Sequence, residues 1–189
     1  MPSEIQSSNV KENYFLLTIF IVLAGALAMG VRLLPHAPNF TPMGALALFV
    51  GAYLARTHKA ALLIPVLLMF LSDLFIGFYD LRLMAVVYAS FLVYGIIGMF
   101  VIKQKSAPTV LLGSIGGALF FYLATNFAVW AFSPFYTHNI QGLLLSYEMA
   151  LPFFRFTLLG DLFFTGVFFG SYEFVIHFLR QRELKLSRA

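Results

Sequence analysis

The stretch AALLIPVLLMFLSDLFIGF, residues 60–78, decides the fold of this chain. It carries a single charged side chain, Asp73, in an otherwise apolar run. About 20 such residues form a helix that crosses the hydrocarbon core of a bilayer, where lipid offers no hydrogen-bond partners to an unpaired backbone. The stretch therefore predicts a membrane-spanning helix with one ionisable group inside the apolar layer.

The rest of the chain has the same apolar character. Of its 189 residues, 61% are hydrophobic and 11% are charged, and its mean hydropathy is +0.89. A soluble domain carries about 25% charged residues, so the surface of this chain must face lipid. The length allows one domain, and the absence of cysteine excludes disulfides and thiolate metal sites. No basic groove interleaved with aromatics is present, so no nucleic-acid partner is predicted.

Six apolar stretches recur along the chain, so the fold class we expect is an all-α integral membrane bundle of six transmembrane helices. The second stretch is short, and the sixth is too long to stand upright in a bilayer. The six stretches cover residues 14–33, 43–55, 60–78, 83–102, 109–132 and 151–179.

Polar tails flank the transmembrane domain, which is expected to span residues 14–179. Residues 1–13 are expected to form an N-terminal tail in the cytoplasm, and residues 180–189 a basic C-terminal tail on the same side. The last loop, 133–150, contains an apolar patch at 140–149, which predicts a short helix lying at the membrane interface.

Lysine and arginine counts set the expected orientation, because cytoplasmic loops are enriched in these residues. With both termini in the cytoplasm, the inner side holds nine of them and the outer half holds three. The nine are Lys11, Arg56, Lys59, Lys103, Lys105, Arg180, Arg182, Lys185 and Arg188, and the three are Arg32, Arg82 and Arg155. Both termini are therefore predicted to be cytoplasmic.

The polar residues within the spans gather toward the outer end of the predicted bundle. They are Asp73, Tyr88, Asn126, Trp130, Arg155 and Thr157. Ionisable groups at this depth are costly and usually line a cavity or a pathway. At about 1.5 Å per residue, Asp73 and Arg155 both lie about 6 to 7 Å below the outer ends of their helices, which predicts an ion pair. Such a pair would order the mouth of a ligand cavity or simply fix helix packing. Alternatively, Arg155 would hold a substrate anion.

Two four-residue repeats place further polar side chains on shared helix faces. One face would carry Tyr122, Asn126 and Trp130 and offer a flat ligand a stacking surface and hydrogen bonds. Alternatively, the two aromatic rings would pack at the membrane interface, and the Asn126 amide would form a hydrogen bond to another helix. Asp161, which shares a face with Thr157, lies near the middle of the bilayer. We expect Asp161 to bond to a neighbouring helix, the alternative being a proton-coupled site.

The predicted outer loop at 34–42 contains three prolines, which stiffen it. His36 and Asn39 in this loop would touch a ligand from above, and His138 in the last outer loop would do the same. A lone loop histidine is more often solvated than a metal ligand, and the sequence has no clustered metal-binding motif. No metal site is therefore predicted.

Small residues at three- and four-residue spacing predict close helix contacts, either inside the bundle or with another membrane subunit. The pairs are Ala24 with Ala28, Ala26 with Gly30, Gly95 with Gly98, and Gly113 with Gly117.

Three stretches resemble a group of uncharacterised six-helix bacterial membrane proteins. They are PNFTPMGALALFVGAYLARTHKAALLIPVLLMFLSDLFIGF (38–78), ATNFAVWAF (124–132) and ALPFFRFTLLGDLFF (150–164). That group in turn resembles the substrate-binding S components of energy-coupling-factor vitamin transporters in size, topology and a glycine-rich second helix. The resemblance implies a multi-pass protein of the bacterial cytoplasmic membrane.

In S components a small molecule enters an outward-facing cavity beneath a short lid loop that follows the first helix. A separate membrane subunit with two ATPases supplies the energy, and the first helix often carries a small-residue docking face, matched here by Ala24 and Ala28. The chain itself has no GxxxxGK[ST] phosphate-binding loop. One related branch handles cobalamin with the help of a cysteine, so His36 or His138 would have to act as the metal ligand here.

Together these features predict a membrane substrate-binding protein for uptake of a small vitamin-like molecule, with no catalytic residue and no cofactor. The cavity would lie among the third to sixth helices, beneath the loops at 34–42 and 133–150. The predicted ligand contacts are Asp73, Tyr88, Asn126, Trp130, Arg155 and Asp161, with His36 and Asn39 in the lid.

Two other classes of protein fit the same pattern. A structural or assembly subunit of a larger membrane complex would pair its polar residues with one another and leave no void, whereas a cavity above about 300 Å³ favours ligand binding. A membrane enzyme would need Asp73 and Asp161 together in one water-accessible pocket as an acid–base pair.

Overall fold

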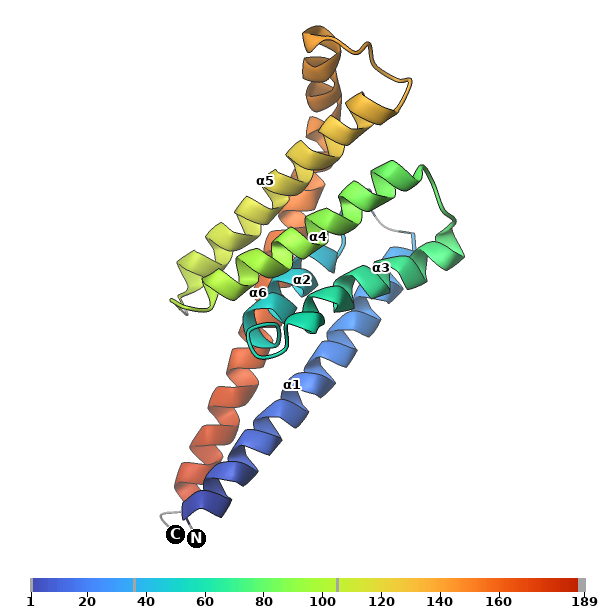
Figure 1. Cartoon of the computed structure of the whole chain (residues 1–189). Coiled ribbons are helices and arrows are strands. Elements are labelled where there is room, and N and C mark those ends of the chain that lie inside the picture. The colour runs from blue at the N-terminus through green and yellow to red at the C-terminus, as the bar shows by residue number, and fades with distance from the viewer. Residues whose placement is uncertain (1, 36, 105, 187–189) are drawn as a thin grey trace.

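The computed structural model describes residues 2–35, 37–104 and 106–186, and within these ranges the chain is helical with no strand (Figure 1). The predicted all-α bundle of six helices is therefore confirmed. The elements are α1 (Pro2–Leu33), α2 (Met43–Tyr53), the 3-10 helix η1 (Lys59–Leu62), α3 (Leu63–Ile76), α4 (Leu81–Val101), α5 (Ala107–Phe132) and α6 (Ile140–Leu186).

Five helical segments of the described chain are long and apolar enough to cross a membrane, which makes this a multi-pass membrane protein. They are Tyr14–Leu33, Lys59–Ile76, Leu81–Val101, Ala107–Phe132 and Ile140–Arg182. Large apolar side chains cover their outer surface: the exposed fractions of Phe15, Phe75 and Phe174 are 67%, 76% and 70%. A surface of this kind is solvated by lipid rather than by water.

The short second helix, α2, lies at the centre of the bundle. Its 11 residues rise about 16 Å, which is roughly half of a hydrocarbon core. Residues 43–52 are all buried, and α2 packs chiefly against α4 and α6. A helix that is apolar on every side is stable in such surroundings, so α2 supplies the core around which the longer helices pack.

Glycines allow α2 and α4 to pack with their backbones in contact. A Cβ on Gly51 would lie 1.9 Å from the carbonyl oxygen of Gly95, and a Cβ on Gly98 would lie 2.1 Å from that of Leu48. Neither contact is sterically allowed, so no larger residue fits without moving a helix. The small-residue strip predicted on α4 therefore serves packing within the chain.

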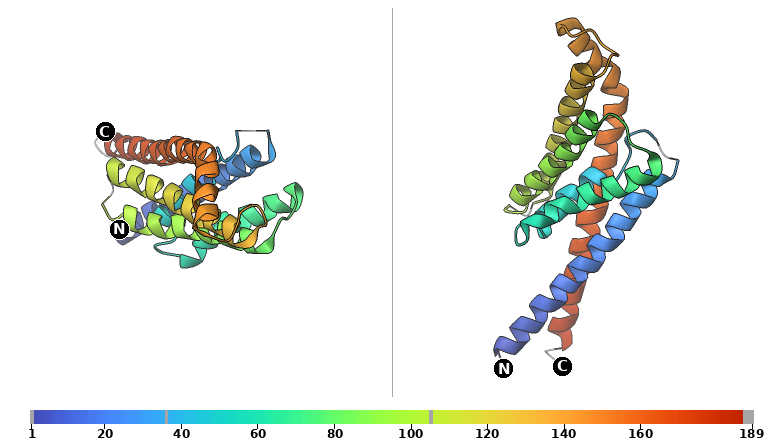
Figure 2. Two further views of the ribbon diagram at one scale, coloured as in Figure 1. Left: turned by 90° about the horizontal axis from the view of Figure 1, so that it is seen from above. Right: turned by 45° about the vertical axis from the view of Figure 1, so that its right-hand side comes forward.

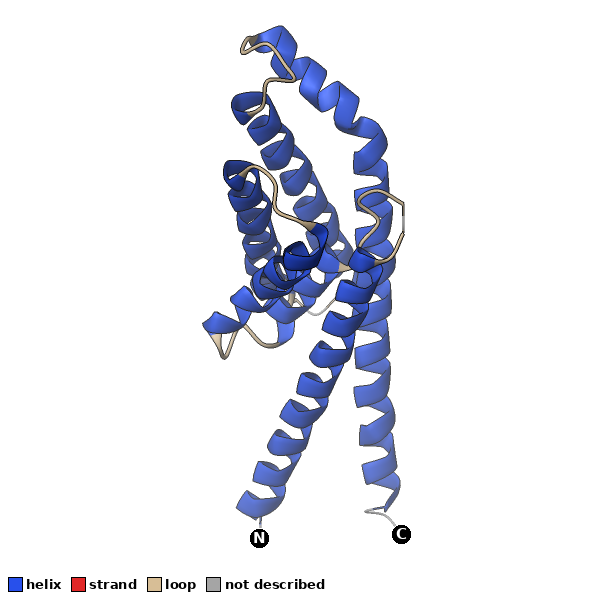
Figure 3. Ribbon diagram, turned by 90° about the vertical axis from the view of Figure 1, so that its right-hand side faces the viewer, coloured by secondary structure: helices blue, strands red, loops and turns tan. Residues whose placement is uncertain are grey.

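The longest helix, α6, includes a segment predicted to be separate. The sequence predicts an interfacial helix at 140–149, but these residues form the first turns of α6. Pro152 lies inside α6, where it removes one backbone hydrogen bond and bends the axis. Figure 3 shows the first turns of α6 set at an angle to the remainder. The expected interfacial helix is thus continuous with the membrane helix across a bend.

Both termini lie at the same end of the bundle, where α1 and α6 extend beyond the other helices (Figures 1 and 2). Residues 2–13, expected to be a polar tail, continue α1 as helix. The connections from α1 to α2 and from α3 to α4 lie away from the termini (Figure 1), and the cavity described next is built beside them.

Candidate ligand-binding cavity

A cavity of about 360 Å³ lies within the part of the bundle that is remote from the termini. Each of the six α-helices contributes to its wall, as do the loops after α1 and α3. The lining residues are Arg32, Asn39, Thr41, Gly44, Met69, Ile76, Tyr79, Val87, Phe91, Tyr94, Phe121, Thr157 and Asp161. The sequence predicts a cavity among the third to sixth helices, but the ends of α1 and α2 also form its wall because α2 lies at the centre.

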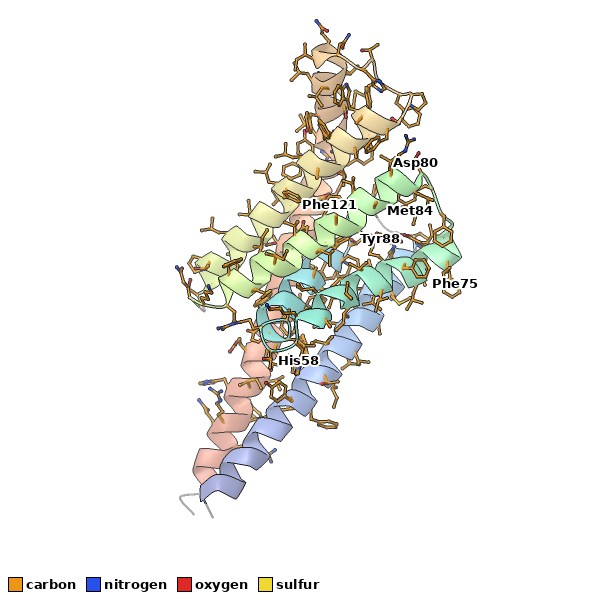
Figure 4. All side chains as sticks on the ribbon, viewed as in Figure 1. His58, Phe75, Asp80, Met84, Tyr88 and Phe121 are labelled. Carbon is orange, nitrogen blue, oxygen red and sulfur yellow. The ribbon has the colours of Figure 1, made fainter. Side chains whose placement is uncertain are left out.

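A network centred on Asp73 joins three helices at one side of the cavity. Nη2 of Arg32 forms an ion pair with Asp73 Oδ1, and Nε of the same arginine donates to the Ser72 hydroxyl at 2.6 Å. Tyr88, which lies between α3 and α4 in Figure 4, donates its hydroxyl to Asp73 Oδ2 at 2.6 Å. Both oxygens of a carboxylate that is 1% exposed are therefore satisfied, which offsets the cost of burying its charge.

The ion pair predicted between Asp73 and Arg155 is wrong. Arg155 is exposed, and its guanidinium lies 4.8 Å from the ring centroid of Phe156. Equal depth along two helices does not make two residues neighbours, because the azimuth and tilt of each helix also matter. Arg32 was the missed residue, and its signal was present: it is a basic side chain at the outer end of a predicted span.

Tyr79 adds a hydroxyl donor to the same side of the cavity. Burial, and after it the negative charge of Asp73, raise the pKa of Tyr79 above its ordinary value, while Arg32 lowers it. The net direction is upward, so the phenol stays protonated at neutral pH. A protonated phenol can donate a hydrogen bond to an acceptor inside the cavity.

Asp161 provides a carboxylate in the wall of the cavity. It is 3% exposed, and Tyr94 of α4 donates its hydroxyl to Oδ2. The predicted bond from Asp161 to a neighbouring helix is therefore confirmed. Asp73 in α3 and Asp161 in α6 thus each accept a tyrosine hydroxyl from α4, through Tyr88 and Tyr94.

Gly44 at the start of α2 makes room for this carboxylate. A Cβ on Gly44 would lie 2.3 Å from Asp161 Oδ1, so only glycine permits the approach. The first amides of a helix have no acceptor within it and carry partial positive charge, which favours an anion nearby. Residue spacing does not predict this contact, because it joins residues of α2 and α6 that are far apart along the chain.

Aromatic rings form part of the wall between these polar groups. The rings of Phe91 and Phe121 have centroids 5.5 Å apart, and those of Phe91 and Tyr94 are stacked at 6.0 Å. Figure 4 shows Phe121 on α5 beside α4. Flat apolar surfaces with a few directed polar groups are typical of small-molecule sites.

The described part of the loop after α1, where the sequence predicts a lid, forms part of the cavity wall. Asn39 lines the cavity and adopts a left-handed backbone conformation with φ of 62°, which asparagine tolerates better than most residues. Phe40 packs on Phe164 with centroids 5.5 Å apart. A Cβ on Gly160 would lie 3.2 Å from the Phe40 Cα, so the loop backbone rests directly on α6. His36, the other predicted lid residue, lies outside the described residues.

The three α5 residues predicted to share one ligand-binding face, Tyr122, Asn126 and Trp130, contact different parts of the structure. Asn126 lines an adjoining hollow of about 120 Å³, which shares Asn39, Phe121 and Thr157 with the main cavity. The Asn126 amide donates to the Tyr122 carbonyl of its own helix at 2.8 Å rather than to another helix.

Trp130 is not among the residues that line either space. Its indole nitrogen donates to the Thr137 carbonyl at 3.0 Å, and its ring meets that of His138 edge-on at 5.9 Å. Trp130 therefore ties the end of α5 to the following loop. Of the residues predicted to contact a ligand, Asp161 and Asn39 line the main cavity, and Asn126 lines the adjoining hollow. Asp73 and Tyr88 line neither space and belong to the hydrogen-bond network of Arg32.

Two further predictions concern docking and metal binding. Ala24 and Ala28 are 4% and 0% exposed, so the chain's own helices cover the predicted docking pair, and another subunit would reach it only if the bundle opened. No group of three or more His, Asp or Glu side chains in the described ranges could hold a metal ion. Asp73 is not among the cavity-lining residues, so the two carboxylates required of a membrane enzyme do not share this space.

The fold and the cavity define a class: an α-helical multi-pass membrane protein whose helices enclose a polar and aromatic cavity. Residues 8–184, almost the whole chain, match the model of a family of unknown function (DUF6580), and the chain belongs to that family. Comparison with curated proteins found no match, and comparison with solved structures found none either.

Proposed function

We propose that this chain is a membrane substrate-binding protein that captures a small, vitamin-sized molecule in the cavity between Arg32 and Asp161. The observation that carries the proposal is the cavity itself. Its volume of about 360 Å³ lies above the lower limit of about 300 Å³ for ligand sites. Its wall combines aromatic rings with a guanidinium, a carboxylate and the Tyr79 hydroxyl, which suits a flat molecule with polar edges.

The molecule would enter beneath the loop after α1, at the end of the bundle remote from the termini. The excess of Lys and Arg toward the termini supports placing that end outside the cytoplasm, and the resemblance to bacterial membrane proteins supports a place in the bacterial inner membrane. Since the sequence contains no phosphate-binding loop, a transmembrane coupling subunit with ATPases would supply the energy. This part of the proposal rests on the resemblance to S components.

A second candidate function is that of a structural or assembly subunit. One observation favours it: Arg32, Asp73 and Tyr88 satisfy one another, and Tyr94 bonds to Asp161. Such pairing is what a packing role requires. The cavity favours capture instead, because a subunit that only packs has no need of an unfilled space among its polar groups.

A pair of variants on α6 tests capture. Thr157→Phe would fill the cavity that Thr157 lines, whereas Leu159→Phe changes a side chain that is 56% exposed on the outer surface. Each protein is extracted into lipid nanodiscs and its bound small molecules are measured by mass spectrometry. We expect a compound with the wild type and Leu159→Phe but not with Thr157→Phe. Equal retention by all three, or none by any, would contradict capture and favour the structural role.

A further inference from the structure

Resting on the proposed function, we infer that the captured molecule carries a positively charged nitrogen, which binds at Asp161. The inference concerns the chemical class of the ligand and follows from the charges and free hydrogen-bonding atoms in the cavity wall.

The charges of the cavity do not balance. Among the described residues that line it, Arg32 is the only basic one and Asp161 the only acidic one. The guanidinium of Arg32 is already paired with Asp73, which does not line the cavity. The cavity and its surroundings therefore hold two carboxylates and one guanidinium, and Asp161 forms no ion pair with any described residue. A buried charge is stable only when it is paired or hydrated.

One oxygen of Asp161 remains open to a ligand. Oδ2 accepts the Tyr94 hydroxyl, while Oδ1 accepts no hydrogen bond from the described chain. Every fully buried side-chain nitrogen or oxygen of those residues has a partner. Oδ1 therefore reaches the cavity space, although the residue is only 3% exposed. An ammonium or a protonated ring nitrogen would donate to Oδ1 and neutralise the carboxylate.

The remainder of the wall suits a cation and disfavours an anion. The rings of Phe91 and Phe121, 5.5 Å apart, offer aromatic faces that attract a positive charge. Arg32 donates its Nε–H to Ser72 and one Nη2 N–H to Asp73, so the positive charge that would attract an anion is already paired. An anionic ligand would also add a third negative charge to a poorly hydrated space.

Three probes of one shape separate the charge classes. Equilibrium dialysis of the full-length, detergent-solubilised protein is performed with tryptamine, which is cationic, with tryptophol, its neutral alcohol counterpart, and with indole-3-acetate, an anion. We expect tryptamine to bind at least about tenfold more tightly than tryptophol, the ratio for one well-placed charged contact, and indole-3-acetate to bind most weakly.

Two substitutions assign the preference to the carboxylate. Asp161→Asn should reduce the tryptamine-to-tryptophol ratio to within about twofold, because it removes the charge and keeps the shape of the side chain. Glu148→Gln is the matched control, because it removes an exposed carboxylate from the same helix outside the cavity. If Asp161→Asn does not fold, the comparison of the three probes in the wild type still decides.

The outcomes separate this inference from the proposed function. Equal or tighter binding of tryptophol or indole-3-acetate overturns the cation and leaves capture standing. If no probe binds but a compound is retained in nanodiscs, the charge of that compound decides: a cation supports the inference and a neutral or anionic compound overturns it. If no probe binds and no compound is retained, both the inference and capture fail.

Discussion

Arg32, near the end of α1, forms a partly buried ion pair with Asp73, which lies near the end of α3. The Tyr88 hydroxyl ties α4 to the same carboxylate. Three helices are therefore joined by one network at the wall of the cavity. This arrangement keeps the Arg32 charge in place while Asp161 faces the space from α6.

The ion pair predicts a large loss of stability when one partner is removed. Arg32→Met would leave the Asp73 carboxylate, which is 1% exposed, without a counter-charge, at a cost of about 3 kcal/mol in the free energy of unfolding. Adding Asp73→Asn should recover part of that loss, because the unpaired charge disappears. Unfolding in mixed detergent micelles measures both values.

Arg155→Met is the control for this prediction. Because Arg155 is exposed and makes no ion pair with any described residue, its removal should change the unfolding free energy by less than about 0.5 kcal/mol. A loss as large as that of Arg32→Met would restore the pairing first predicted from helix depth.

The contact between α2 and α4 predicts a steric effect. Gly98→Ala would place a Cβ 2.1 Å from the Leu48 carbonyl oxygen, forcing the helices apart and costing about 2 kcal/mol or more. Gly116→Ala on α5, where a Cβ meets nothing within 4 Å, should be neutral or slightly stabilising. Thermal unfolding followed by circular dichroism distinguishes them, and equal midpoints would show that the backbones are not in contact.

Gly44 predicts an effect on binding. Gly44→Ala would place a Cβ 2.3 Å from Asp161 Oδ1 and displace the carboxylate, so tryptamine affinity should fall by about tenfold or more. Gly30→Ala, where a Cβ meets nothing within 4 Å, should leave it unchanged. Equilibrium dialysis measures both, and undiminished affinity in a folded Gly44→Ala protein would remove Asp161 Oδ1 from the site.

Asp80 predicts a pH-dependent contribution to stability. Its side chain caps α4 by accepting from the Arg82 and Leu83 amides, and the Arg82 guanidinium lowers its pKa to about 2. Because the folded-state pKa is depressed, the stabilisation is fully present above the ordinary value of about 4 and is lost as the pH falls toward 2.

Two substitutions of Asp80 separate the stabilisation due to its charge from that due to its capping oxygen. Asp80→Ser keeps a capping oxygen but loses the charge, whereas Asp80→Ala loses both. At pH 7 the thermal midpoint should fall more for the alanine variant than for the serine variant, and neither should retain the wild-type change between pH 4 and pH 2. A wild-type pH profile in either variant would assign the titration to another group.

Much of the fold follows from local pattern. Runs of apolar residues such as 60–78 predict helices in lipid whatever their neighbours are, because an unpaired backbone cannot be tolerated there. The same reasoning predicts that buried Asp161 must bond to a neighbouring helix, and Tyr94 fills that role. A proline-rich loop after the first helix was predicted to cover a cavity, and Asn39 lies in its wall.

The sequence by itself determined that this is an all-α membrane protein with polar groups buried toward one end, because the length and polarity of a segment decide whether it enters lipid. Only the tertiary structure decided which groups meet: Arg32 rather than Arg155 pairs with Asp73, and Gly44 admits Asp161. Distance along a helix is one coordinate, whereas a contact requires three. The other two come from helix tilt and rotation, which close packing around α2 sets through glycines far apart along the chain.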